Sequence, residues 1–503
     1  MNLRLILIAG MLALFAGTAN VSAQYKPEYK PDSTQTGVSS IPEGAVVPGQ
    51  GAKPDAVSGA SRRPDAVSGA SRRPDATTGA SYQVAPEEHK VLSKLARAAS
   101  RLSLGGYGEA AYTRNFYSQH FNRYKSPEDH EDDPSHGTFD LPHVVIFIGY
   151  DFGKGWSMQS EIEFEHGGAE SAVEVEADES GEYEQEIERG GEVAIEQFYI
   201  QKTFFPWLNV RGGELVIPIG ETNAHHMPTE FFTVYRPEGE DSILPCTWHQ
   251  VGISVWGRIP QWGYEVLVTS GLDSERFGND SFVHDGATSP YEFKIANNYA
   301  LALRIDNYSI KGLRLSASGY YGRSFDNTLK SHTSSTYDGC HGDLWIGTFG
   351  FQYKDKHFLV RGNFDYAHLP DADLITSFNK TFPSHTGSND GTPSKHQPVG
   401  ESALMYGVEA GYDIFSHLNL RNKDSKLYIF GRYEYYNSME SGTSASTYEW
   451  CKKNRFAVGL NYFPLPDIVI KAEYSYRKFT STYNNEPSVS LGIAYSGWFL
   501  NGK

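Results

Sequence analysis

Short segments of strictly alternating apolar and polar residues fill the chain from about residue 102 to its end. Leu313 and Leu315 stand on either side of Arg314 in one segment, and Ile470 precedes Lys471 in another. A period of two is typical of a β-strand, whose successive side chains point to opposite faces. Nearly every segment is apolar on one face and charged on the other. This pattern predicts an all-β fold, a transmembrane antiparallel β-barrel with lipid outside and water inside.

About sixteen strands can be drawn, and an even number places both ends of a bacterial barrel in the periplasm. The predicted strands cover approximately residues 102–115, 142–153, 155–166, 192–204, 207–218, 249–259, 262–272, 297–308, 311–323, 343–354, 356–368, 402–415, 425–437, 454–463, 467–479 and 487–499.

The connectors between these segments alternate in length. Short turns lie at 152–155, 205–206, 259–261, 354–356 and 463–466. Long loops lie at about 116–141, 167–191, 219–248, 273–296, 324–342, 369–401 and 438–453. Short periplasmic turns and long outer loops are expected of an outer-membrane barrel, so the alternation supports the strand assignments.

Residues 1–23 have the features of a secretory signal peptide. Arg4 precedes an apolar stretch over residues 5–15, and Val21-Ser22-Ala23 provides a small-residue cleavage site. An apolar stretch this short does not span a bilayer. We expect a mature chain that begins near Gln24, carries no lipid anchor because no cysteine stands at that junction, and resides in the outer membrane.

Two segments are predicted between the signal and the barrel domain at residues 102–503. Residues 24–85 are rich in Pro, Gly, Ser and Ala and predict a disordered periplasmic tail. Ten-residue repeats fill residues 53–82, and either a tether or a docking peptide for another envelope component would fit them. Residues 86–101 predict a short periplasmic helix with Pro86 in its first turn and one apolar face. That face would pack on the barrel mouth or on other copies of the chain.

Composition narrows the possible partners. The net charge of −17 argues against a nucleic-acid partner. Aromatic residues make up 14% of the chain and include 32 Tyr, which suits aromatic girdles at the two membrane interfaces. The three cysteines, Cys246, Cys340 and Cys451, cannot all pair within one chain and form no C-x-x-C spacing. They are either loop thiols or include one incidental disulfide.

A sixteen-stranded barrel is too wide for side chains to fill, so we expect a water-filled lumen. The period of two assigns basic and acidic side chains to its wall, where they would filter solutes by charge or simply be solvated. The basic residues are Arg211, Arg258, Arg304, Arg314, Arg361, Arg432, Lys471 and Arg477. The acidic residues are Glu161, Glu163, Glu165, Asp306, Asp365, Glu409, Glu434 and Glu473.

The third long loop, at about 219–248, is more apolar and aromatic than a free surface loop. Phe231, Phe232 and Leu244 need packing partners, which the inner wall of the barrel would supply if the loop folded inward. The residues then expected at the narrowest point are Glu221, Glu230, Arg236 and Glu238. The pore-lining and constriction residues predicted in this way are Glu221, His225, His226, Glu230, Arg236, Glu238, Arg211, Arg258, Arg304, Arg314, Arg361 and Arg432.

Metal binding and catalysis are two alternatives to a channel. His225, His226 and Glu230 could bind a metal, but adjacent histidines do not share a face as an i, i+4 pair does, so no metal site is predicted. The acidic stretches at 128–136 and 167–191 are either solvated or bind divalent cations beside lipopolysaccharide. The chain contains no G-x-S-x-G, H-E-x-x-H or Walker motif, so neither a cofactor nor an enzyme is expected.

Several motifs in order resemble the outer-membrane porins grouped with the phosphate-selective porins O and P. They occur at residues 104–109, 191–199, 216–223, 228–229, 236–238 and 243–248. The resemblance implies a sixteen-stranded barrel, an inward third loop, passive diffusion and a homotrimer. The chain departs from that family in its acidic loops, which lack a lysine cluster, so phosphate selectivity is not predicted. It also ends a few residues beyond Phe499 instead of on an aromatic residue.

The predicted function is an outer-membrane porin for passive diffusion of small hydrophilic solutes or ions. One alternative is a surface adhesin or scaffold whose barrel only anchors large loops. A barrel enzyme is the third hypothesis. Outer-membrane lipids and lipopolysaccharide are the expected surroundings of the barrel in all three cases.

Overall fold

The computed structural model describes residues 100–124, 126–177, 183–289, 293–328, 335–381, 396–418, 424–441, 449–480 and 485–501. All of them belong to one unit, Lys94–Lys503. The predicted signal peptide, tail, repeats and short helix lie outside the described residues, so they stay predictions.

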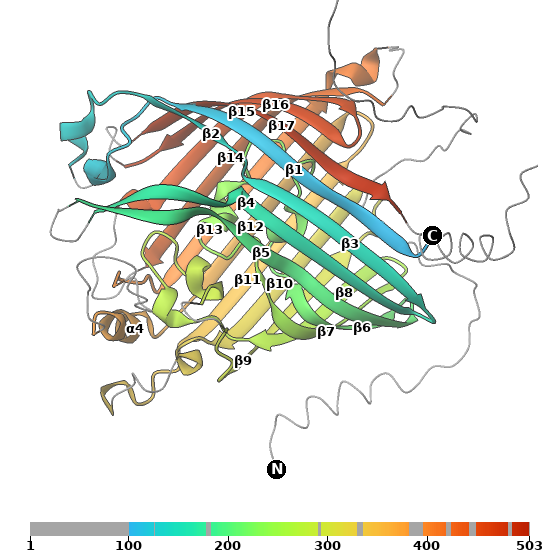
Figure 1. The fold of residues 1–503 in the computed structure, drawn as a ribbon, viewed down its shortest axis with the longest axis horizontal. Coiled ribbons are helices and arrows are strands. Elements are labelled where there is room, and N and C mark those ends of the chain that lie inside the picture. Colours follow the sequence, from blue (N-terminus) through green and yellow to red (C-terminus); the bar gives the residue numbers. More distant parts are fainter. Residues whose placement is uncertain are drawn as a thin grey trace, which may run out of the picture. The chain divides into compact units, whose positions relative to one another are not determined.

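Antiparallel strands make up most of the described chain (Figure 1). The strands are β1 (Leu102–Asn115), β2 (His136–Asp140), β3 (His143–Gly153), β4 (Trp156–Ala177), β5 (Tyr183–Phe205), β6 (Leu208–Val216), β7 (His249–Ile259), β8 (Trp262–Ser270), β9 (Tyr299–Asn307), β10 (Leu313–Arg323), β11 (Asp343–Lys354), β12 (Phe358–His368), β13 (Ser402–Asp413), β14 (Lys426–Ser441), β15 (Lys452–Leu465), β16 (Ile468–Lys478) and β17 (Glu486–Leu500). The α-helices are α3 (Glu238–Asp241) and α4 (Ala372–Asn379). The 3-10 helices are η1 (Phe121–Tyr124), η2 (Pro127–His130), η3 (Asn223–His225), η4 (Ser274–Arg276), η5 (His284–Ala287), η6 (Phe325–Asn327), η8 (Ser335–Tyr337), η9 (Ile414–His417) and η10 (Glu449–Cys451).

The sheet closes into a barrel because β1 pairs with β17 along most of its length. On its other edge β1 pairs with β3 through one half and with β2 through the other half. Strands β2 and β3 therefore occupy one position in the wall, separated at Pro142, which has no N–H to donate to a neighbouring strand. The wall thus has sixteen positions, and the predicted fold class is confirmed. The prediction that β2 belongs to a loop is wrong.

The β4–β5 hairpin extends beyond its neighbours, as the green ribbons at the left of Figure 1 show. The two strands pair with each other from Glu170↔Gly190 to Ala177↔Tyr183, past the last pairings with β3 and β6. The predicted loop at 167–191 is therefore wrong for most of its length. The acidic composition favoured a loop, but Val173 and Val175 keep the period of two, and cross-strand pairing satisfies the backbone.

Exposure along the wall is the reverse of that in a soluble protein. On β16, Ile470 is 47% and Tyr474 46% exposed, whereas Lys471 is 2% and Glu473 4% exposed. The same alternation runs along β9, where Leu303 and Ile305 are exposed. Apolar side chains outside and charged side chains inside are the arrangement of a transmembrane barrel. Among the described residues, no helix is long and apolar enough to cross a membrane.

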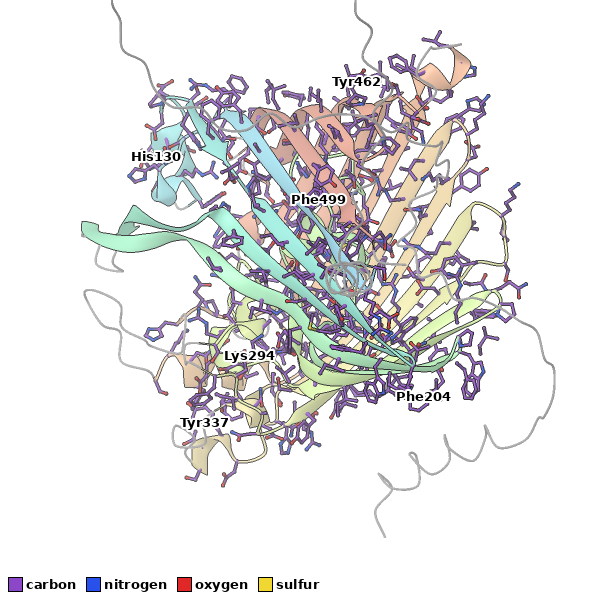
Figure 2. All side chains as sticks on the ribbon, turned by 45° about the vertical axis from the view of Figure 1, so that its right-hand side comes forward. His130, Phe204, Lys294, Tyr337, Tyr462 and Phe499 are labelled. Atoms are coloured by element: carbon purple, nitrogen blue, oxygen red, sulfur yellow. The ribbon has the colours of Figure 1, made fainter. Side chains whose placement is uncertain are left out.

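The two ends of the barrel differ in the length of their connections. Phe204 marks the short-turn end in Figure 2, whereas His130, Lys294 and Tyr337 lie in long connections at the opposite end. One long connection, residues 217–248 between β6 and β7, is called the inward loop below. Its Ile217, Ile219 and Trp248 are at most 1% exposed and pack in the main apolar cluster.

Candidate permeation path and inward loop

A buried carboxylate fixes the start of the inward loop. Glu240, on α3, is fully buried and accepts hydrogen bonds from the backbone N–H groups of Glu221 (2.8 Å), Thr222 (3.0 Å) and Asn223 (2.8 Å). Asn363 Nδ2, on β12, donates a fourth at 3.0 Å. Because a loop has no strand partner for its backbone, these bonds supply the acceptor that buried N–H groups require.

Asn223 joins the two ends of the loop. Its Nδ2 donates to the carbonyls of Ile217 (2.7 Å) and Ile219 (3.1 Å), and its Oδ1 accepts from the N–H of Trp248 (2.7 Å). The side chain is 1% exposed, so all of these bonds are shielded from water. The hydrogen bonds of this one side chain therefore hold the segment that leaves β6 next to the segment that returns to β7.

The middle of the loop reaches the wall nearly halfway around the ring of strands. Lys471 Nζ, on β16, donates to the carbonyl of Thr233 at 2.7 Å, and Asn461 Nδ2, on β15, donates to that of Phe232 at 3.0 Å. Glu473 accepts from the N–H of Val234 at 2.7 Å. The prediction that this loop turns inward agrees with these contacts, and apolar packing of Phe232 against Tyr428 and Phe430 accompanies them.

A row of alternating arginine and glutamate side chains runs across five neighbouring strands of that wall. The pairs are Arg361–Glu409 (2.7 Å), Arg432–Glu409 (3.1 Å), Arg432–Glu434 (2.8 Å), Arg455–Glu434 (3.2 Å) and Arg455–Glu473 (2.7 Å). We call this row from β12 to β16 the charge ladder. Each charge in the middle of the row has a partner on both sides, which offsets the cost of taking it out of bulk water.

Glu238 of the inward loop caps the charge ladder. Its carboxylate pairs with Arg477 at 2.5 Å and with Arg455 at 3.3 Å, and accepts from the Tyr436 hydroxyl at 2.8 Å. Burial raises the pKa of Glu238, but the two guanidinium groups outweigh burial and hold that pKa well below its usual range. The loop is therefore tied to the wall by a carboxylate that stays ionised.

A second ionic contact holds the beginning of the loop. Glu221 is 8% exposed and accepts from Arg304 Nη2 at 3.2 Å and from Ser316 Oγ at 2.9 Å, and it also pairs with Arg314. His225 contacts Arg314 through Nε2 and Glu230 through Nδ1 (3.4 Å). These predicted residues come together in one cluster on β9, β10 and the loop.

The other predicted residues lie apart from that cluster. Arg236 donates to the Tyr107 hydroxyl at 3.2 Å, on the side of β1. Arg211 pairs with Glu265 at 2.6 Å. Arg258 is exposed near the β7–β8 turn, with its guanidinium carbon 4.1 Å from the Tyr308 ring centre. The predicted set is thus spread over the inner face and does not form a single ring, and its role in permeation stays a prediction.

The histidine–glutamate metal hypothesis does not fit the geometry. Within the described part of the chain, His225, His226 and Glu230 are not a group whose ligand atoms converge. His226 instead lies with Glu161 and Glu196, and their ligand atoms are within 4.8 Å of one another. Adjacent residues in this loop point different ways, as the spacing argument expected.

Three buried residues of this region were missed by the sequence reasoning. Arg455 alternates with the outward Phe456, so the period of two could have found it. Glu240 lies in a loop, where no period applies. Glu196 is inward because β5 carries a β-bulge that changes the period, and nothing in the sequence marks that bulge.

The comparisons with known proteins give a distant set of similar chains. No family model matches this chain. A protein of Aquifex aeolicus (strain VF5), described as uncharacterized, is 27% identical over 420 residues, which cover 80% of this chain and 83% of that protein. The resemblance to the phosphate-selective porins therefore stays a prediction.

Three solved structures show the level of this similarity. An anion-selective porin from Comamonas acidovorans is 10% identical, over 79% of this chain and 99% of that chain, with a TM-score of 0.44. Pseudomonas putida OprB is 10% identical, over 82% and 96%, with a TM-score of 0.45. Salmonella typhi OmpF, in complex with daunomycin, is 8% identical, over 79% and 98%, with a TM-score of 0.46. Similarity at this level does not carry an activity over to this chain.

Proposed function

We propose that the chain is an outer-membrane porin through which small hydrophilic solutes or ions diffuse passively. The observation that carries the proposal is the reversed exposure of a closed wall, with aliphatic side chains outside and charged side chains inside. An apolar exterior needs lipid, and a charged interior needs water or ionic partners. A barrel of this strand number leaves room for an aqueous channel.

The inward loop narrows that channel. Its support is the set of contacts from the β6–β7 side to Lys471, Asn461 and Glu473 on the far wall, which place backbone across the barrel. Glu221 and Glu238 anchor the loop at its two ends through arginines of the wall. Solutes would pass beside the loop, along wall residues that are only partly buried, such as Arg211 and Glu265.

Planar-bilayer recording tests the proposal. The purified, folded full chain should produce stepwise currents in KCl, and its folding should be checked first by heat-modifiable migration on gels. A folded barrel that inserts but gives no steps would contradict the channel and support the scaffold alternative.

Sedimentation of the same preparation tests the oligomeric state. The family resemblance implies a homotrimer, so the chain should sediment as a trimer. A monomer would contradict the homotrimer but not the channel.

A further inference from the structure

A β-bulge turns one acidic residue of β5 into the barrel. Glu161 pairs with Gln197 and Ile162 pairs with Ile195, so Glu196 is the extra residue between two paired positions. Ile195 is 56% exposed on the outer face, and Glu196 is fully buried on the inner face. Bulges commonly re-aim a side chain next to a functional site. A carboxylate at such a buried position needs an ionic or hydrogen-bonding partner.

Two glutamates and a histidine converge at the bulge. The ligand atoms of Glu161, Glu196 and His226 all lie within 4.8 Å of one another. Glu161 Oε2, both carboxylate oxygens of Glu196 and His226 Nε2 are buried and lack a hydrogen bond of good geometry within the described part of the chain, and the Thr247 and Gln197 side chains lie close to the two carboxylates. Unsatisfied buried polar atoms are costly, and their presence on three residues whose ligand atoms converge indicates a missing partner.

The hydrogen bonding of His226 leaves its second ring nitrogen available as a metal ligand. His226 Nδ1 lies 2.8 Å from the backbone carbonyl of Asn223, and a carbonyl only accepts, so Nδ1 carries the hydrogen. In the neutral ring this leaves a lone pair on Nε2, which has no hydrogen bond of good geometry within the described residues. Histidine ligands of metals are typically oriented in this way by a hydrogen bond from the second ring nitrogen.

The charges around the bulge also favour a cation. Glu163, 3% exposed, lies on the same strand as Glu161, and Arg236 contacts it at 3.8 Å. The three carboxylates therefore have two guanidinium groups near them, Arg236 and, beside Glu161, Arg211. A divalent cation would bring the group close to neutral, whereas on the opposite wall arginines already balance the glutamates of the charge ladder.

We propose that Glu161, Glu196 and His226 bind a divalent transition-metal ion of the Zn²⁺ class. The mixed set of carboxylate and imidazole donors suits Zn²⁺, whereas Ca²⁺ and Mg²⁺ prefer oxygen ligands alone. Two of the ligands belong to wall strands β4 and β5, and the third belongs to the inward loop. The ion would therefore tie the loop to this wall, as Lys471 and Asn461 tie it to the other. The site does not depend on channel activity.

The site is tested by measuring how many Zn²⁺ ions bind to each purified full chain. The chain carries no polyhistidine tag. The folded protein is stripped with a chelator, dialysed to equilibrium against micromolar Zn²⁺ in millimolar Mg²⁺, and analysed by mass spectrometry of the metal. The excess Mg²⁺ occupies exposed acidic stretches. We expect about one Zn²⁺ per wild-type chain, lost in Glu196→Gln and in Glu161→Gln and kept in Glu230→Gln, the matched control from the same loop.

Three outcomes would overturn the assignment: no Zn²⁺ on the folded wild-type chain, Zn²⁺ retained by both Glu196→Gln and Glu161→Gln, or equal loss in Glu230→Gln. If the glutamine variants do not fold, anomalous diffraction of the wild-type protein at the zinc edge decides. A peak beside His226 Nε2 and Glu196 supports the site, and a peak elsewhere or no peak refutes it.

Discussion

At the scale of single residues, buried charges and not apolar contacts alone hold the inward loop. Glu240 serves several backbone N–H groups, and Glu238 is bound by two arginines. Such groups are costly to bury alone and strongly destabilising to remove once paired. The position of the loop should therefore depend on a few carboxylates that no sequence period could identify.

Replacing Glu240 with Gln should destabilise the folded barrel and loosen the loop. The amide keeps the size of the side chain but loses the charge that strengthens each N–H contact, and a hydrogen bond to a charged group contributes about 1.5–3 kcal/mol. The heat-induced gel shift should occur at lower temperature, and current noise should increase. Glu128→Gln, at an exposed site outside the barrel wall, is the control and should behave as wild type. An unchanged shift temperature in Glu240→Gln would show that the loop does not need this carboxylate.

The pH dependence of loop anchoring follows from Glu238. Because its pKa in the folded protein is below the ordinary value, its contribution to stability is complete above about pH 4.3 and is lost as pH falls through the folded pKa. The difference in conductance between the wild type and Glu238→Gln isolates this group, and it should stay constant from about pH 8 to 5 and change at lower pH. A difference that changes near neutral pH would contradict the role given to Glu238.

At the scale of elements, alternation predicts the strands, including the extension of β4 and β5, but it does not predict the bulge in β5. Alternation located the strands to within a few residues because lipid and water impose different requirements on the two faces. The extension of the β4–β5 hairpin is predicted as a loop because its composition is acidic, although the alternation of Val173 and Val175 is that of a strand. Glu196 was missed because one extra residue in β5 reverses the period locally.

The charge ladder should stabilise the wall as a unit. Arg455→Gln would leave Glu434 and Glu473 without one of their partners inside the barrel, which we expect to cost about 3–5 kcal/mol. Urea unfolding in lipid vesicles measures this loss. Arg258→Gln, the same change at an exposed position near a turn, should cost far less. Equal effects of the two variants would mean that the ladder adds little.

Removing the inward loop should enlarge the channel. Replacing residues 221–240 with a short Gly–Ser linker removes the backbone that crosses the barrel, so single-channel conductance should rise. Deleting residues 170–190, where β4 and β5 pair only with each other, is the control and should leave conductance unchanged in concentrated KCl, which screens the charge of the acidic hairpin. Wild-type conductance in the loop variant would place the constriction elsewhere.

At the scale of the whole molecule, the two faces of one closed sheet account for both the proposed location and the proposed function. The outer face is set by lipid and the inner face by water, salt bridges and the inward loop. The sequence was sufficient for the class of fold, because a period of two that recurs along most of a chain is typical of sheets with two different faces. It was not sufficient for the site, because the loop contacts depend on which strands face each other across the barrel.

The charge of the molecule predicts its ion preference. A net charge of −17 and an acidic β4–β5 hairpin should draw cations to the channel. Reversal potentials in a KCl gradient should therefore favour K⁺ over Cl⁻. Arg258→Glu, an exposed inner-face position by alternation, should increase that preference. A preference for Cl⁻ in the wild-type chain would contradict this prediction.

Quenching of a probe at neighbouring positions of β9 tests the central claim most directly. Ile305 is 41% exposed on the outer face, and Asp306 follows it on the inner face. After replacement of the three native cysteines, a fluorophore is attached to Ile305→Cys or to Asp306→Cys in lipid vesicles. A quencher on the lipid chains should act on the probe at position 305, and a water-soluble quencher on that at position 306. Equal quenching of both probes from water, or the opposite pattern, would contradict the assignment of lipid to the outer face and water to the lumen.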